Sequence, residues 1–474
     1  MTSDNSIENS GSVFSKDDIV KLGIIALIFL AFNAGYYALS YPESRIQFDS
    51  PSYIEPAEML VNEFKYESVL RLPGYPLLIA GAMAITNNYV AAVIVIQIGL
   101  TLCAGVFAVM IGNYYLQKIS WPLFLLVLFN SAVMPYNHTI LPDVLFMVLF
   151  LGYLLFLIKT VKDKSLWNAL WCGVFAGLMT LTRGNGYYLS LLTPLLIMVC
   201  YIGEFKNIGF KKVAIKPVIF LIVFAAVISP WLAFNYKTKG TLSVNTSEYM
   251  DQSVIQVLVG VDRLGKGATF FEAFDSVREK AAEIKASETG EYVDPKTIDG
   301  DYLVSHGREI FFMHPKKDNA KAILIATGLF YFDPGYKPIA NQLKIECLHL
   351  DNSVFGGRWT VGRFFKTLFS SSSLPLILDV GLIGFIVLLR ILAVVGFFAC
   401  FKGKDWQLLM FAGVTVLYFT VTTGLVAYAR YRVAIEPVLL ILAVMGATYC
   451  KDTWQKTRAI DAKFKHANNT DINA

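Results

Sequence analysis

Residues 89–112 read YVAAVIVIQIGLTLCAGVFAVMIG, without a single charged side chain. A membrane-spanning helix needs about 20 predominantly apolar residues, so this run is long enough to cross a bilayer. The rest of the 474-residue chain has the same character, since 55% of its residues are hydrophobic, only 16% are charged and its mean hydropathy is +0.53. Soluble domains carry about 25% charged residues. The composition therefore excludes soluble, coiled-coil and disordered proteins and predicts an all-α polytopic membrane protein.

About ten segments satisfy the length and hydropathy of a membrane span. They are 21–41, 89–112, 121–137, 142–159, 167–182, 186–203, 214–236, 377–401, 406–427 and 431–450. The polar stretch 42–88 contains one further apolar piece, Tyr75 to Ile85, which is too short to span and predicts a re-entrant or interfacial helix.

The spans divide the chain into five expected parts. These are an N-terminal tail (1–20), a seven-span module (21–236) with its first outer loop (42–88), a large outer loop (237–370), three C-terminal spans (371–450) and a C-terminal tail (451–474). Lysines concentrate in alternate connections, around residues 118, 159–164, 206–216 and 402–404, and in the tail. Loops rich in Lys and Arg stay in the cytoplasm. We therefore expect a multi-pass protein of the inner or plasma membrane, with both termini cytoplasmic and loops 42–88 and 237–370 on the extracytoplasmic side.

Several function classes find no support in the sequence. The net charge is +5, but the chain has no RNA-binding or helix-turn-helix signature, so no nucleic-acid partner is expected. It also lacks a Walker A loop, a kinase motif set and a GxSxG motif, which argues against a nucleotide cofactor and against serine-hydrolase chemistry.

Two acids occupy helix ends that are expected on the outer face. Asp49 follows the first span closely, and Asp143 begins the fourth span after Pro142. Each has an ordinary structural explanation, because Asp is common in turns and favourable at helix N-termini. The alternative is chemical: two such carboxylates could activate a hydroxyl or hold a divalent metal. His138 could assist them, although one histidine without a second at ligand spacing is a weak metal signal.

Cationic side chains recur at the same depth. They are Arg71, Arg183, Lys237, Arg430 and Arg432. A single Arg at a span end is commonly a snorkelling anchor. Several of them converging would instead form a site for a lipid-borne phosphate, because the guanidinium fork matches phosphate oxygens.

Four motifs, taken in order, resemble a known family. They are Asp49-x-x-x-Tyr53-x-x-x-Ala57 followed by Pro73-Gly74-Tyr75-Pro76; Asp143 at the start of the fourth span; Leu181-Thr182-Arg183-Gly184; and Ser229 to Tyr236 with Gly240. Together with seven spans before a large outer loop, they resemble the GT-C membrane glycosyltransferases. The resemblance is nearest to family 39 and its relatives, which include protein O-mannosyltransferases and lipid A aminoarabinose transferases.

The resemblance covers residues 21–245 and is weak beyond them, apart from Arg430-Tyr431-Arg432 and Pro437. One departure is Phe234, which stands where the family usually has an Arg before Asn-Tyr. Arg390 lies near the middle of the eighth span and is expected to face the bundle or a water-filled cleft.

The resemblance implies transfer of a sugar from a polyprenyl-phosphate carrier to an acceptor hydroxyl or phosphate, on a glycan, lipid or protein, by inverting displacement. In that scheme Asp49 is the general base or a metal-bound carboxylate, and Asp143 supports it. The five cations listed above become candidates for the lipid phosphate. Tyr53, Tyr75 and His138 become candidates for substrate binding, and Asp49, Asp143 and His138 for a divalent metal.

A second function class stays open on the sequence alone. A transporter or flippase for lipid-linked glycans would have many spans and no transfer chemistry. Transporters often show internal repeats and broken helices at the membrane midplane. This sequence shows no repeat and places its acids at the outer edge, which favours the transferase. A third possibility is a receptor-like scaffold, which would use the segment 237–370 only for protein contacts. Only the transferase predicts that Asp49 and Asp143 approach each other and open onto one cleft.

Overall fold

The computed structural model describes residues 15–47, 49–68, 71–115, 120–163, 165–201, 210–244, 247–345, 374–403, 406–426 and 429–471. Within these ranges every regular element is a helix, and no β-strand occurs. The expected all-α fold class is confirmed.

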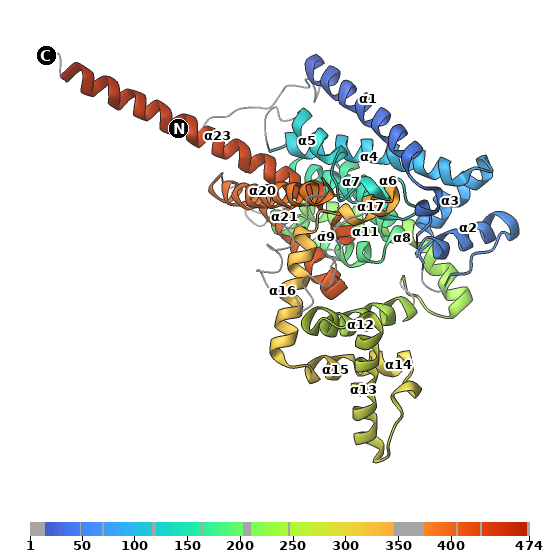
Figure 1. Ribbon diagram of the computed structural model, residues 1–474. Coiled ribbons are helices and arrows are strands. Elements are labelled where there is room, and N and C mark those ends of the chain that lie inside the picture. Colours follow the sequence, from blue (N-terminus) through green and yellow to red (C-terminus); the bar gives the residue numbers. More distant parts are fainter. Residues whose placement is uncertain are drawn as a thin grey trace.

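Six helices of the described residues are long and apolar enough to cross a membrane. They are α1 (Lys16–Leu39), α4 (Tyr89–Asn113), α7 (Asp143–Lys162), α11 (Phe210–Lys239), α20 (Leu374–Gly403) and α21 (Trp406–Thr423). Helices suit the bilayer because each satisfies its own backbone hydrogen bonds where no water is present. The apolar part of α7 is 78% buried and that of α1 only 17%, so α7 is central in the bundle and α1 lies at its edge (Figure 1).

Three further helices complete the bundle. They are α8 (Trp167–Thr182), α9 (Asn185–Cys200) and α23 (Glu436–Asp471). Small residues let neighbouring helices approach closely. A Cβ added at Gly173 would lie 2.8 Å from the carbonyl oxygen of Phe220, so α8 packs directly on the backbone of α11. Gly396 and Gly446 leave no room for a Cβ between α20 and α23.

The expected third span, 121–137, is not one helix. It divides into α5 (Ser120–Leu128) and α6 (Met134–Asn137). Between them the Oδ1 atom of Asn130 accepts a hydrogen bond of 2.9 Å from the backbone N–H of Ala132. Such local bonds compete with helical ones, and Pro135 has no N–H to continue the helix.

The segment 42–88, predicted as the first outer loop, holds η1 (Pro42–Arg45), α2 (Pro51–Glu63) and α3 (Gly74–Ile85). The apolar piece that begins at Tyr75 therefore forms a short helix, as expected. Two contacts seat α3 on the bundle. The hydroxyl of Tyr75 donates to Gln97 of α4 over 2.8 Å, and a Cβ at Gly74 would lie 2.8 Å from the carbonyl oxygen of Leu181. The start of α3 thus lies against the end of α8.

The segment 237–370, which the sequence predicts as a large outer loop, is largely helical where it is described. It contains α12 (Ser247–Val261), the π-helical turn η2 (Asp262–Lys266), α13 (Phe270–Thr289), η3 (Pro295–Thr297), α14 (Gly300–Ser305), α15 (Gly307–Met313), α16 (Lys316–Phe332) and α17 (Tyr336–Leu343). Helices α12 to α15 form a lobe with its own small apolar core, which includes Leu258, Val277 and Ile310. Figure 1 shows this lobe below the bundle and α16 returning from it. The end of the expected loop, 346–370, lies outside the described residues.

The C-terminal region follows with α20, α21, η4 (Gly424–Val426), α22 (Ala429–Arg432) and α23. Helix α23 continues to Asp471, so the expected tail 451–474 is helical over most of its length. This extension projects away from the bundle (Figure 1).

Candidate active site

Asp49 lies in the turn that leads into α2, and its carboxylate faces cations rather than the helix end. The N-cap position of α2 is Ser50, which makes no side-chain capping bond. An Oδ atom of Asp49 accepts a hydrogen bond of 2.6 Å from Nη1 of Arg430. The other lies 3.6 Å from Nη2 of Arg71. The Asp49 side chain is 41% exposed, so it remains accessible from solvent.

Asp143 is the first residue of α7 and its side chain is fully buried. It accepts a bond of 2.8 Å from Nη1 of Arg183, which stands at the junction of α8 and α9. It accepts a second bond, of 3.1 Å, from Nε of Arg430. A carboxylate at a helix N-terminus also benefits from the helix dipole.

Arg430 of α22 therefore joins the two acids, which come from loop and helix positions almost a hundred residues apart in the chain. Arg71 completes the group: its Nε donates to the hydroxyl of Ser52 over 2.8 Å and its guanidinium lies 4.4 Å from the ring centroid of Tyr53. Three guanidinium groups thus face two carboxylates. One positive charge is left over among these five side chains.

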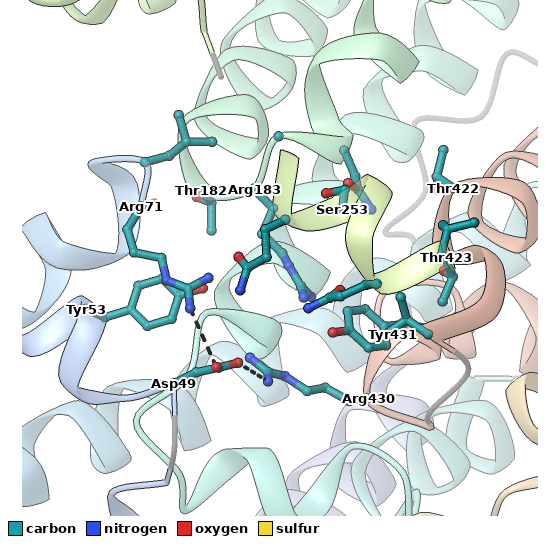
Figure 2. A pocket seen from close by; sticks show the side chains of 17 residues that line it. Asp49, Tyr53, Arg71, Thr182, Arg183, Ser253, Thr422, Thr423, Arg430 and Tyr431 are labelled. Carbon is teal, nitrogen blue, oxygen red and sulfur yellow. Dashed lines mark hydrogen bonds and ion pairs between the residues drawn. The ribbon is translucent and has the colours of Figure 1, made fainter. Parts of the chain in front are cut away.

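Four of these five charged side chains border a cavity of about 160 Å³, shown in Figure 2. Asp49, Tyr53, Arg71, Arg183 and Arg430 all line it. Asp143 lies behind Arg430 and Arg183 and is not part of the lining, so the two acids approach each other through Arg430 and only Asp49 opens onto the cavity.

Most of the other lining residues are neutral and polar, and Leu72, Gly184, Val257 and Val426 complete the lining. The polar ones are Thr182, Asn185, Gln252, Ser253, Gln256, Thr422 and Thr423, with Tyr431 beside them. The sequence motifs include Thr182 and Tyr431 but give no indication of the residues from α12 or of Thr422 and Thr423. Residues 252–256 belong to α12 of the lobe formed by α12 to α15, and no motif or spacing connects that helix to the segment 42–88.

The cations control the protonation of Asp49. Burial alone raises the pKa of its carboxyl group, but the charge and hydrogen bond of Arg430, with the charges of Arg71 and Arg183, outweigh burial and lower the pKa below its ordinary value of 3.8. Asp49 is consequently ionised at neutral pH.

Four of the residues singled out in the sequence lie away from the cavity. Arg432 is fully buried on the other side of α22 and pairs with Glu436. Lys237 is exposed near the end of α11. Tyr75 is buried beneath Tyr53, with ring centroids 5.5 Å apart at an angle of 87°.

His138 is the fourth of these residues. Its side chain is fully buried, and Nε2 lies 2.9 Å from Oδ1 of Asn33 on α1. Burial lowers the pKa of His138 to about 4, so the ring is neutral at pH 7.

The donor set does not fit a divalent metal. Among the described residues, no three His, Cys, Asp or Glu side chains are grouped as metal ligands would be. The two acids share three guanidinium neighbours, whose charge opposes that of a cation. We therefore derive no step through a metal.

Phe234, the departure from the family pattern, has a packing role. Its ring stacks on Trp231 with centroids 5.3 Å apart and meets the edge of Tyr66 at 6.1 Å. The hydroxyl of Tyr66 in turn donates to the carbonyl oxygen of Arg71 over 2.7 Å. The aromatic cluster thus supports the backbone that carries Arg71.

No protein-family model matches the chain, and no curated protein matches it in sequence. Among solved structures it is similar to the archaeal oligosaccharyltransferase AglB from Archaeoglobus fulgidus in complex with an inhibitory peptide and a dolichol-phosphate. The TM-score is 0.50 and the identity 12%, over 94% of this chain and 52% of that chain. This chain thus spans about half the length of AglB.

ArnT from Cupriavidus metallidurans is also matched, at lower TM-scores. Its apo structure gives 0.35 with 12% identity, over 89% of this chain and 76% of that chain. Its structure bound to undecaprenyl phosphate gives 0.37 with 11% identity, over 92% and 78%. The likeness to AglB, at almost full coverage of the present sequence, shows that this polytopic membrane protein has the GT-C fold.

Proposed function

We propose that the protein transfers a sugar from a polyprenyl-phosphate carrier to an acceptor hydroxyl or phosphate at the outer face of the membrane. The observation that carries the proposal is the cavity in which the ionised carboxylate of Asp49 faces Arg430, Arg71 and Arg183. The GT-C fold supports the general class, and AglB, which shares it, was solved with dolichol-phosphate.

The charge balance suits such a donor. A phosphodiester between a sugar and a polyprenol carries one negative charge, and the five charged side chains of the site leave one positive charge. Guanidinium groups bind phosphate oxygens with a matching planar fork. Arg183 and Arg430 are the proposed phosphate ligands, because both border the cavity and both also hold Asp143 in place.

In the transfer step the acceptor oxygen bonds to the anomeric carbon of the sugar while the bond from that carbon to the phosphate oxygen breaks. The acceptor proton passes to a carboxylate oxygen of Asp49, and the polyprenyl phosphate leaves. Attack opposite the leaving group inverts the anomeric configuration. Electrostatic stabilisation of the departing phosphate is the task of the arginines.

A carboxylate with a lowered pKa is a weak base, so the ion pairs of Asp49 need an explanation. Donor binding provides one: a phosphate that shares Arg430 partly neutralises the charge that keeps the pKa of Asp49 low. The pKa of Asp49 then rises in the complex, toward the range in which proton transfer is effective.

The neutral wall contributed by Gln252, Ser253 and Gln256 is suited to sugar hydroxyl groups, since amides and hydroxyls both donate and accept hydrogen bonds. Figure 2 shows Ser253 among the side chains that line the cavity together with the arginines, so these α12 residues are available to a sugar or acceptor bound beside the phosphate.

The proposal is tested with detergent-purified protein and a panel of polyprenyl-phosphate sugars. Release of polyprenyl phosphate in the presence of candidate acceptors is expected for at least one donor, and it should depend on Asp49. A protein that moves lipid-linked sugars between the leaflets of proteoliposomes without breaking the sugar-phosphate bond would contradict the proposal and favour the transporter.

A further inference from the structure

Helix α22 is a single turn that carries two arginines on opposite sides. Arg430 points into the cavity toward both acids. Arg432, two residues later, is the largest fully buried side chain of the described residues and points away from the cavity. The placement of Arg430 therefore depends on what holds the other side of this turn.

The end of α16 holds it at two points. Asp333, just after α16, accepts a bond of 3.2 Å from the backbone N–H of Ala429 through its side chain, and a bond of 2.7 Å from Nη2 of Arg432 through its carbonyl oxygen. Arg432 also donates to the carbonyl oxygen of Phe330. Carbonyl groups at a helix C-terminus lack intrahelical partners and attract cations. Arg432 thus caps α16 and anchors α22 to it.

A second buried arginine caps the same helix. Arg390, from the middle of α20, donates through Nε to the carbonyl oxygen of Tyr331 over 3.1 Å. Its Nη2 donates to both carboxylate oxygens of Glu436, over 2.7 and 2.8 Å, and Arg432 donates to the same carboxylate over 2.7 Å. Glu436 also accepts a bond of 3.1 Å from Asn130, at the break between α5 and α6.

A contribution to folding stability does not by itself explain this network of buried ion pairs. Buried ion pairs bring a desolvation cost that well-packed apolar residues avoid, and one role by which they are retained is the fixing of a single arrangement. Nη1 of Arg390 is buried without a hydrogen-bond partner among the described residues, so the network is not optimised for bonding either. A role in position accounts for this arrangement better than a role in stability.

We propose that Arg390, Arg432 and Glu436 form a positioning unit that fixes the orientation of α22, and thereby holds Arg430 between Asp49 and Asp143. The unit joins α16 to α20 and α23 of the bundle. It therefore also fixes where residues 247–345 lie against the bundle, including α12, which lines the cavity. Only its consequence for transfer rests on the proposed function.

Thermal melting tests the unit without reference to activity. Asp143→Asn should lower the melting temperature, because Arg183 and Arg430 then lose a charged acceptor. If Glu436 holds Arg430 in place, the same substitution should cost about half as much or less in a Glu436→Gln background, since directly coupled changes are not additive. Asp262→Asn is the matched control. Asp262 is a buried acid in η2 that pairs with Lys266 and Lys280, and the fall in melting temperature caused by Asp262→Asn should add to that caused by Glu436→Gln.

Arg390→Lys provides a second background, should Glu436→Gln not fold. It keeps the charge but not the two-sided contact with Tyr331 and Glu436. An unchanged Asp143→Asn shift in whichever of these backgrounds folds would overturn the proposal, because Arg430 would then stay in place without the unit.

The pH profile of transfer is the second readout. When Arg430 moves away, Asp49 keeps only Arg71 and Arg183, its pKa rises, and the acid limb of the profile should move to higher pH in Glu436→Gln. Lower turnover with an unmoved acid limb would show a merely structural role and overturn the proposal. Failure to find any transfer with the wild-type protein would count against the proposed function and leave the melting result decisive for the positioning unit.

Discussion

Asp49→Asn should abolish sugar transfer while leaving the protein folded. The substitution keeps the size of the side chain and removes its charge and its basicity. Loss of a general base costs roughly a hundred- to ten-thousandfold in rate. At about 1.36 kcal/mol for each factor of ten, this corresponds to about 3 to 5 kcal/mol of transition-state stabilisation.

The structure predicts a much smaller effect on stability. The Asp49 side chain is 41% exposed, and exposed ion pairs contribute about 0 to 1 kcal/mol. Arg430 is not left unpaired, because it still donates to Asp143 over 3.1 Å. Asp143→Asn is the contrasting variant: its carboxylate is fully buried between two guanidinium groups, and removing one partner of a buried pair costs about 3 to 5 kcal/mol.

The assay is transfer from a defined polyprenyl-phosphate sugar by detergent-purified variants, with melting temperature as the folding control. Asp49→Asn should melt close to wild type and turn over at least about a hundred times more slowly. Asp143→Asn should melt at a clearly lower temperature. Near-wild-type turnover by a folded Asp49 variant would remove this residue from the mechanism and refute the assignment of the cavity as a catalytic site.

Three other expectations follow, two from the geometry and one, on topology, from the distribution of lysines along the sequence. Arg183→Gln should raise the KM for the lipid donor by roughly tenfold or more, the value of one charged hydrogen bond, and leave the KM for the acceptor unchanged. Lys237→Gln, at an exposed position away from the cavity, should change neither, and an acceptor effect of Arg183→Gln would move that residue out of the donor site. In a background without exposed native cysteines, a cysteine at Glu291 should react with an impermeant reagent added outside the cell and one at Lys402 should not; the reverse pattern would invert the topology. Asp262 has a pKa lowered from 3.8, chiefly because the hydrogen bonds of His314 and Lys266 outweigh burial, so its stabilisation is present above pH 4 and lost as the pH falls below it. Asp262→Asn should therefore weaken the dependence of the melting temperature on pH below 4, and an unchanged acid dependence would count against this ion pairing.

The sequence predicted the fold class because long uncharged runs leave few alternatives in a chain of this composition. It did not predict the break in the segment 121–137, since that break depends on Asn130, whose amide serves both a local turn and the distant Glu436. A hydropathy profile does not distinguish a polar side chain that has a tertiary partner from any other polar side chain. For the same reason the sequence did not predict that Gln252 and Ser253 line the cavity, since this depends on where α12 lies against the bundle.

The acids show which part of the site could be predicted. Asp49 and Asp143 are candidates from the sequence because each stands at a helix end on the expected outer face, and in the structure both bond to Arg430. The ends of the predicted spans indicate how deep each residue lies in the membrane. Residues at the same depth on the same side are therefore candidates for a common site. Depth alone could not separate Arg430 from Arg432, since residues two apart on a helical turn lie at similar depth and face different sides.

The position of Arg430 between an accessible acid and the proposed phosphate site gives the weak base of this site a physical rationale. In the proposed reaction the leaving phosphate gains one negative charge when the sugar-phosphate bond breaks, and Asp49 becomes neutral as it takes the acceptor proton. The total charge of the site does not change, because the negative charge moves from the carboxylate to the phosphate. Arg430 lies 2.6 Å from Asp49 and borders the same cavity. It can therefore pair with the Asp49 carboxylate before the reaction and with the phosphate after it, so that neither negative charge is left without a cation. A stronger base, without an arginine neighbour, would accept the proton more readily but would provide no cation to receive the departing phosphate.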